Sequence, residues 1–140
     1  MNPSIVSHRI KYIAIGLLVF IGMSALGGGL MLIMDPTGNS MEFTLDLLSS
    51  TPFNDYSIPG ILLFSFIGLM SLTVAWIVKN QWNYAYNLLI IQGLIIIIWL
   101  TVQLILNNDF YLGLYHIPLY FMGTIICIIG VALKKSSTTK

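Results

Sequence analysis

The stretch YNLLIIQGLIIIIWLTVQLIL, residues 86–106, contains no Asp, Glu, Lys or Arg. A bilayer core about 30 Å thick is crossed by roughly 20 residues of α-helix, which rises about 1.5 Å per residue. Because lipid offers the backbone no hydrogen-bond partner, an apolar stretch of this length is expected to fold as a helix. Residues 86–106 therefore predict a transmembrane helix.

Three more apolar stretches of similar length flank this one, at residues 12–34, 58–78 and 115–133. The chain of 140 residues is 57% hydrophobic and 8% charged, whereas a soluble domain averages about 25% charged residues. The alternation of apolar and polar residues that marks a membrane β-barrel is missing from these stretches. The sequence predicts an all-α fold, an integral membrane four-helix bundle that forms a single transmembrane domain over residues 1–140.

The charged residues divide between the two sides of the predicted bundle. The basic residues precede the first span, lie between the second and third, or follow the fourth: Arg9, Lys11, Lys79, Lys134, Lys135 and Lys140. The acidic residues fall in the other two connections: Asp35, Glu42, Asp46, Asp55 and Asp109. Because loops rich in Lys and Arg stay in the cytoplasm, both termini are expected inside and the connection 35–57 outside.

A cleavable signal peptide is the alternative interpretation of the N-terminus. The start is basic, an apolar run follows, and small residues surround positions 25–27. The apolar run continues to Met34, however, and is longer than the 7–15 residues of a usual signal-peptide core. The first span is therefore predicted to stay in the membrane.

The external connection, residues 35–57, is predicted to contain a turn and a short amphipathic helix. Residues 35–38 read Asp-Pro-Thr-Gly, which is typical of a type I turn. Met41, Leu45 and Leu48 then recur at helical spacing, opposite Glu42 and Asp46. This pattern predicts a helix over 41–49, capped by the residue at 39 or 40, whose apolar face lies on the bilayer surface or across the mouth of the bundle.

Several classes of function are disfavoured by what the spans lack. No ionisable Asp, Glu, Lys or Arg lies in the middle of a span, and proton-coupled transporters and voltage sensors generally need one. Cys127 is the one cysteine, so a redox pair of thiols within the chain is excluded. His116 stands at a span boundary, which suits haem poorly. The net charge of +1 gives nucleic-acid binding no electrostatic basis. No metal or cofactor is expected.

Neutral polar residues form two stripes at helical spacing. The third span carries Gln92, Ile96, Trp99 and Gln103, and the fourth carries His116, Tyr120, Gly123, Cys127 and Gly130. If the two stripes face each other, they line a cavity that opens outward beneath the loop helix. The alternative is interhelical hydrogen bonding, which contributes about 0.6–2 kcal/mol per side chain in membranes. The sequence leaves both interpretations open.

Small residues in the first two spans predict close helix packing. Ala25 and Gly29 are four residues apart in the first span, and Gly60 and Gly68 lie on one strip of the second. Such spacing lets two membrane helices approach closely. The run at 27–29 is three glycines at the outer end of a span, where it also offers room for a ligand or a lipid head group.

The segments GGGLMLIMDPTGNSMEF and STPFNDYSIPG, together with Trp99, Gln103 and LYFMG in the fourth span, resemble a family of small bacterial four-span membrane proteins. These proteins carry a GG…DP(S/T)G…PFxDYxIPG signature. The resemblance covers most of the chain and implies a multi-pass protein of the bacterial cytoplasmic (inner) membrane. It assigns no catalytic residue, and any kinship to DoxX-like four-helix proteins is one of architecture, which does not fix function.

Three functional hypotheses follow. The first is a non-catalytic accessory subunit or a binder of lipid or a small apolar ligand, with Gln92, Trp99, Gln103, His116 and Tyr120 lining the cavity. The second is a redox or metal-dependent membrane enzyme that uses groups at the outer boundary, namely Asp35, Asp55, Asp109 and His116. The third is a passive channel formed by oligomerisation. The expected partners are the bilayer, a lipid or apolar ligand, and either a second copy of the chain or another membrane protein.

Overall fold

The structure is a computed structural model that describes the backbone of residues 3–106 and 113–138 and the side chains of residues 8–105 and 116–137. Within these ranges the chain is helical, with turns and bends but no strand. The elements in chain order are α1 (Pro3–Met34), η1 (Asn39–Met41), η2 (Leu45–Leu48), α2 (Ser57–Leu62), η3 (Leu63–Leu69), α3 (Met70–Lys79), α4 (Ala85–Leu106) and α5 (Gly113–Thr138).

Four helices in the described ranges are long and apolar enough to cross a membrane: His8–Met34, Ser57–Lys79, Ala85–Ile105 and His116–Ser137. These segments confirm the predicted all-α four-helix fold. Large apolar side chains also cover the outside of the bundle, including Phe20, Ile98 and Ile128, each more than half exposed. Such a surface suits a lipid environment, as expected of a multi-pass membrane protein.

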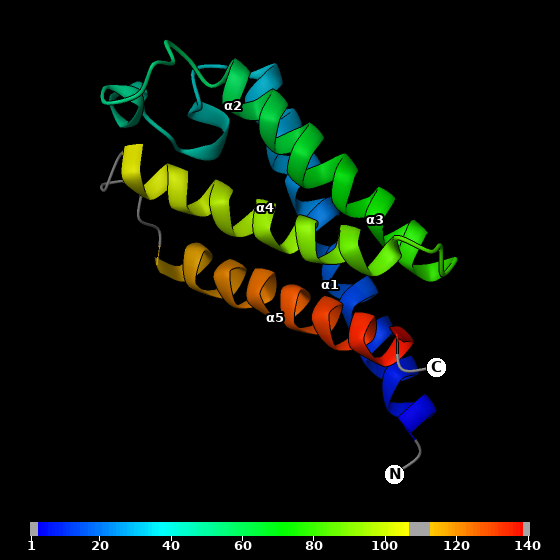
Figure 1. The fold of residues 1–140 in the computed structure, drawn as a ribbon. Coiled ribbons are helices and arrows are strands. Elements are labelled where there is room, and N and C mark those ends of the chain that lie inside the picture. The colour runs from blue at the N-terminus through cyan, green and yellow to red at the C-terminus, as the bar shows by residue number, and fades with distance from the viewer. Residues whose placement is uncertain (1–2, 107–112, 139–140) are drawn as a thin grey trace.

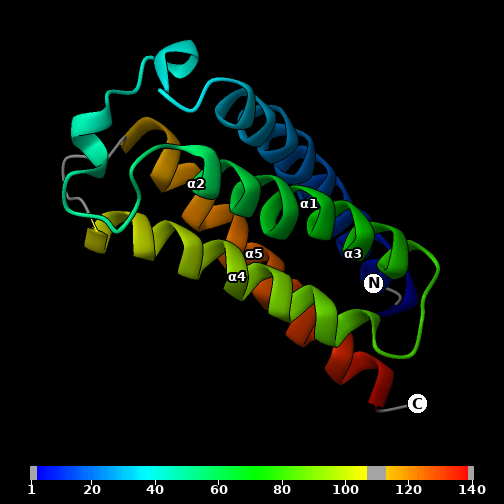
Figure 2. The ribbon, with the colours of Figure 1, turned by 90° about the horizontal axis from the view of Figure 1, so that it is seen from above.

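The bundle consists of two helical hairpins. In the first, α1 packs against the second span, which is built from α2, η3 and α3, and in the second α4 packs along α5. Figures 1 and 2 show the second span beside α1, and α4 beside α5. Both termini and the α3–α4 turn lie at one end, while residues 35–56 cover the other (Figure 1). We call these the terminal end and the loop end.

The four helices meet mainly in the half of the bundle near the terminal end. Ala14, Leu18, Val78, Leu89 and Ile126 are fully buried there in one apolar cluster, with one or more residues from every span. The described basic residues also lie toward this end, while the described acidic residues lie in the 35–56 segment. The bundle therefore separates its charges along its length, which is the pattern read from the sequence.

Glycine allows the two helices of the first hairpin to touch backbone to backbone. A Cβ atom added at Gly29 would lie 2.7 Å from the Phe64 nitrogen and 2.9 Å from the Gly60 oxygen. A Cβ atom at Gly60 would lie 3.1 Å from the Gly29 oxygen. Because backbone atoms cannot swing aside as a side chain does, these positions admit no larger residue without separating the helices.

The second hairpin is closed in the same way. A Cβ atom at Gly93 of α4 would lie 2.8 Å from the Gly123 oxygen of α5, and one at Gly130 would lie 3.2 Å from the Ile90 nitrogen. The Cys127 thiol packs against Gly93 and lies 3.5 Å from the Ile90 carbonyl oxygen. The α5 stripe predicted from the sequence thus packs tightly against α4.

The second span is a single rod with a wider turn at its centre. Residues Leu63–Leu69 form a π-helix between α2 and α3. Segments of this kind are rare and are frequently found at functional positions. Here the π-helix adjoins both the first hairpin's glycine contact and the interface with α4.

The prediction of one continuous amphipathic helix over residues 41–49 is wrong. The segment forms two short 3₁₀ turns, η1 and η2, separated by Glu42 in the left-handed region at φ +59°. Asn39 and Ser40 lie inside η1 rather than capping a longer helix. A helix of two turns is marginal by itself, and the break lets Met41, Phe43 and Leu48 all pack inward against Leu32 and Tyr56.

Candidate functional site

A cavity of about 590 Å³ lies between the two hairpins at the loop end. Its walls come from the loop-end halves of α1, the second span, α4 and α5, and its roof comes from residues 41–56. Apolar side chains dominate the lining: Ile21, Ala25, Met31, Leu32, Met41, Phe43, Leu47, Leu48, Phe53, Leu62, Leu63, Ile67, Ile96, Leu100, Val102 and Leu119. A volume of this size is within the roughly 300–1,000 Å³ of small-molecule sites.

Tyr56 holds the roof together. Its hydroxyl donates to the Thr44 carbonyl oxygen at 2.8 Å, and its amide donates to the Pro36 carbonyl oxygen at 2.9 Å. Its ring packs against Gly38, where φ is +82° and an added Cβ atom would lie 2.7 Å from the ring. Gly38 is thus needed both for its left-handed backbone and for its lack of a side chain. Burial raises the pKa of the Tyr56 phenol.

The apolar side chains within residues 35–56 give this segment a small core of its own. Leu48 and Tyr56 are buried with Leu32 of α1, and Met41, Phe43 and Phe53 pack around them. We call residues 35–56 the lid. Because its buried face is also the roof of the cavity, whatever occupies the cavity contacts the lid directly.

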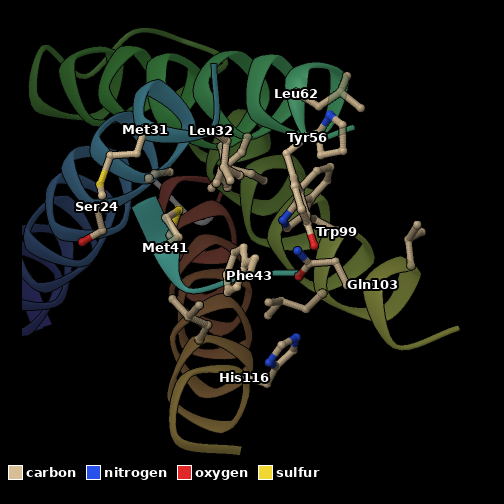
Figure 3. Close-up of a pocket in the computed structure, with 18 of the residues that line it drawn as sticks. Ser24, Met31, Leu32, Met41, Phe43, Tyr56, Leu62, Trp99, Gln103 and His116 are labelled. Carbon is tan, nitrogen blue, oxygen red and sulfur yellow. The ribbon is translucent and has the colours of Figure 1, made fainter. Parts of the chain in front are cut away.

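Three of the five residues predicted from the polar stripes line this cavity. Trp99 and Gln103 come from α4 and His116 from the start of α5. Figure 3 shows the Trp99 and Gln103 side chains pointing into the space beneath the lid, beside Tyr56, with His116 on the α5 side. His116 is buried, being 4% exposed. These three predicted residues therefore lie toward the α4–α5 side of the site.

Gln92 does not contribute to the cavity lining but joins the two hairpins below it. Its Nε2 donates to Ser71 Oγ of α3 at 2.8 Å and to the Phe66 carbonyl oxygen of η3 at 3.1 Å. The carbonyl can only accept, which fixes the orientation of the amide. Its Oε1 is buried without a hydrogen-bond partner among the described residues. Interhelical hydrogen bonding, the second of the two interpretations left open by the sequence, accounts for Gln92.

Tyr120 likewise lies outside the residues that line the cavity. Its hydroxyl is 2.9 Å from Thr101 Oγ1, so the two side chains link α5 to α4. Thr101 Oγ1 also lies 2.8 Å from the Ile97 carbonyl oxygen, to which it donates. The contact fastens the second hairpin near the site.

Asp35 and Asp55, the predicted external loop residues, both stabilise the lid locally. The Asp35 carboxylate accepts from the Thr37 hydroxyl and from the Thr37 and Ser40 amides. The hydroxyl of Thr37, followed by the amide of Ser40, holds the pKa of Asp35 below its usual value. Asp55 Oδ1 accepts from the Ser57 amide at 2.9 Å, in the first turn of α2. The turn predicted at 35–38 closes through Gly38 N–H to Asp35 C=O at 3.0 Å.

The described side chains form no cluster of the kind that holds a metal ion. Among residues 8–105 and 116–137, no three His, Cys, Asp or Glu side chains lie close enough to hold one ion. Asp109, which the enzyme hypothesis also requires, lies outside the described residues. What the cavity can do chemically is enclose apolar surface and offer a few hydrogen bonds from neutral groups.

Several lining residues were not among the sequence candidates. α1 contributes Ser24 and Gly28, and the lid contributes Met41, Phe43 and Thr51. The glycine run at 27–29 was the one signal in α1, and its three residues have different roles. Gly29 packs on the second span. A Cβ atom at Gly27 would have no described neighbour within 4 Å, whereas one at Gly28 would lie 3.7 Å from both Leu63 and Met41.

No protein-family model, curated protein or solved structure matches this chain.

Proposed function

We propose that this protein is a non-catalytic membrane protein that binds a lipid or another small apolar molecule in the cavity beneath the lid. The observation that carries the proposal is an apolar cavity of about 590 Å³, lined by all four spans and roofed by the lid, whose apolar side chains pack with Leu32 of α1. Each Å² of apolar surface that binding removes from water contributes about 25 cal/mol to the binding free energy. The few polar side chains would orient the ligand.

We also propose the bacterial cytoplasmic membrane as its location, with both termini inside. The separation of basic and acidic residues between the two ends of the bundle supports this orientation. In this orientation the lid and cavity face the outer side of the membrane. The resemblance of the sequence to small bacterial four-span proteins is the reason for choosing this membrane.

The test uses adjacent glycines of α1 that differ in what surrounds them. A side chain at Gly28 would enter the cavity, while a side chain at Gly27 would meet open space. We expect the wild-type protein, purified in mild detergent, to carry a bound lipid or apolar molecule detectable by native mass spectrometry. Gly28→Leu should lower its occupancy by at least about tenfold, equal to about 1.4 kcal/mol, and Gly27→Leu should leave it unchanged.

Both substitutions remove the helix-weakening effect of glycine equally. A difference in ligand occupancy between the two variants therefore shows the effect of the side chain that enters the cavity. Thermal unfolding checks that each variant is folded. The proposal is wrong if the wild-type protein carries no such molecule at any stage of purification, or if Gly27→Leu and Gly28→Leu reduce occupancy to the same extent.

A further inference from the structure

Two polar side chains of the cavity lie together and have no hydrogen-bond partner in the described part of the chain. Trp99 carries an indole N–H and Gln103 a primary amide, one turn apart on α4, and both line the cavity. Neither side chain has a hydrogen-bond partner among the described residues. Figure 3 shows both side chains on α4, in the same part of the cavity as Tyr56. Because a polar group in an apolar site is costly without a partner, this position favours a ligand that supplies one.

The charges around the cavity limit what that ligand group is. Among the residues that the structure describes, no Asp, Glu, Lys or Arg lines the cavity, and the basic residues lie toward the terminal end of the bundle. The lid above contains Asp35, Glu42, Asp46 and Asp55. An anionic head group would lie beneath an acidic lid with no described cation beside it, and a cationic head would lose its water without gaining an ion pair. A neutral head that both donates and accepts hydrogen bonds fits the site.

The rim of the cavity lies partly at the sides of the bundle. Met31 of α1 and Val102 of α4 line the cavity and are 44% and 41% exposed. Ser24, deeper in α1, is also exposed and lines it. These positions are inside the spans rather than in the lid, so the cavity reaches the lipid-facing side of the helices. An apolar chain held inside can therefore continue outward into the bilayer.

We infer that the ligand is a single-chain amphiphile with a neutral hydrogen-bonding head, taken from the membrane, whose head binds Trp99 and Gln103 while its chain lies along α1. This inference rests on the proposed function and specifies its ligand class. The head would donate to the Gln103 amide oxygen and accept from the Trp99 indole or the Gln103 amide nitrogen. The chain would lie beside Gly28, where α1 leaves room.

Three photoactivatable probes of equal chain length test the inference: a long-chain alcohol, the matching carboxylate at pH 8, and the matching alkane. Each is added to the protein in nanodiscs, and the labelled peptides are identified by mass spectrometry. We expect the alcohol to label cavity residues at least about fivefold more than the carboxylate or the alkane. Gln103→Leu should reduce labelling by the alcohol to the level of the alkane. Thr124→Val, which removes an exposed hydroxyl on α5 bonded to its own helix, should change nothing.

The outcomes separate the inference from the function on which it rests. Strong cavity labelling by all three probes alike, or strongest labelling by the carboxylate, would overturn the neutral-head inference and leave apolar binding in place. No cavity labelling by any probe would overturn both. Gln103→Leu keeps roughly the size of the side chain and lies at the cavity wall, so its thermal unfolding temperature is expected to stay close to that of the wild type. If this variant is destabilised, Trp99→Phe provides a second variant.

Discussion

Gln92 of α4 donates to Ser71 Oγ of α3 at 2.8 Å, and this contact lies inside the membrane-spanning part of the bundle. Both side chains are fully buried. The same amide nitrogen also reaches the Phe66 carbonyl oxygen in the π-helix at 3.1 Å. One side chain therefore ties the second hairpin to the first just below the cavity, and the two hairpins are held at a fixed spacing where the cavity begins.

A double-mutant cycle measures this link. Gln92→Met and Ser71→Ala each remove one partner, and we expect a coupling free energy of about 0.6–1.7 kcal/mol in the unfolding of the protein in detergent or bicelles. Gln92→Met also removes Oε1, which is buried without a described partner, and this change offsets part of the stability lost with the hydrogen bond. The cycle is needed to separate the two effects. Gln103→Met paired with Ser71→Ala serves as the control and should show no coupling. Coupling within error of zero for Gln92 and Ser71 would mean that the bond does not stabilise the fold.

Glycine substitutions separate the helix contacts from helix propensity. Gly29→Ala and Gly93→Ala place a methyl group against backbone atoms of the neighbouring helix, and we expect each to lower the free energy of unfolding by about 1–3 kcal/mol. A methyl group at Gly16 or Gly27 would have nothing within 4 Å of it. Alanine at these two positions should be neutral or stabilising by up to about 1 kcal/mol. Equal effects at all four positions would contradict the packing described for the hairpins.

The spans were predictable because the bilayer sets their length. The third stretch was expected at 86–106 and forms α4 at Ala85–Leu106. The first helix extends back to Pro3, well before the apolar stretch begins, because a helix does not end where hydrophobicity ends. The π-helix at Leu63–Leu69 left no signal in the sequence, since it depends on how the second span packs against its neighbours.

The lid and the cavity show where sequence patterns stop being informative. Met41, Leu45 and Leu48 recur at helical spacing, yet the left-handed Glu42 breaks the helix, because packing on the apolar core of the lid outweighs two turns of helix. In α4, Gln92 and Gln103 lie on one stripe, yet the first joins the hairpins and the second faces the cavity. They differ in depth along the bundle. Spacing reports the face of a helix but not where neighbouring helices separate.

Tyr56→Phe tests the lid. The variant loses the bond from the hydroxyl to the Thr44 carbonyl oxygen, which we expect to lower stability by about 0.5–1.5 kcal/mol. Hydrogen exchange should become faster in peptides that cover residues 44–57 and stay unchanged in α4. Tyr84→Phe is the matched control, because Tyr84 is half exposed in the α3–α4 turn. Unchanged exchange in the lid of Tyr56→Phe would show that the hydroxyl does not hold it closed.

The same residue predicts a response to alkaline pH. Burial raises the pKa of Tyr56 above its ordinary value of 10.0, so the folded protein holds the phenolic proton more tightly than the unfolded chain does. Its contribution to stability is complete below pH 10 and is lost as the pH rises through the folded pKa. The wild-type protein should therefore lose more stability than Tyr56→Phe above pH 10, with ionisation of the other tyrosines and lysines common to both. Parallel curves for the two proteins would contradict this assignment.

Site-directed labelling determines the orientation on which the outward-facing cavity depends. Ser49 is exposed at the end of the second lid turn and Ser137 is exposed in the last turn of α5, so a cysteine at either position is accessible to a reagent on its side. In a Cys127→Ala background, a membrane-impermeant maleimide added to intact cells should label Ser49→Cys but label Ser137→Cys only after permeabilisation. The background protein alone should remain unlabelled. This result is expected because basic flanks resist translocation and lie with Ser137 at the terminal end. Labelling of Ser137→Cys but not of Ser49→Cys in intact cells would instead place the lid in the cytoplasm and the cavity on the inner side.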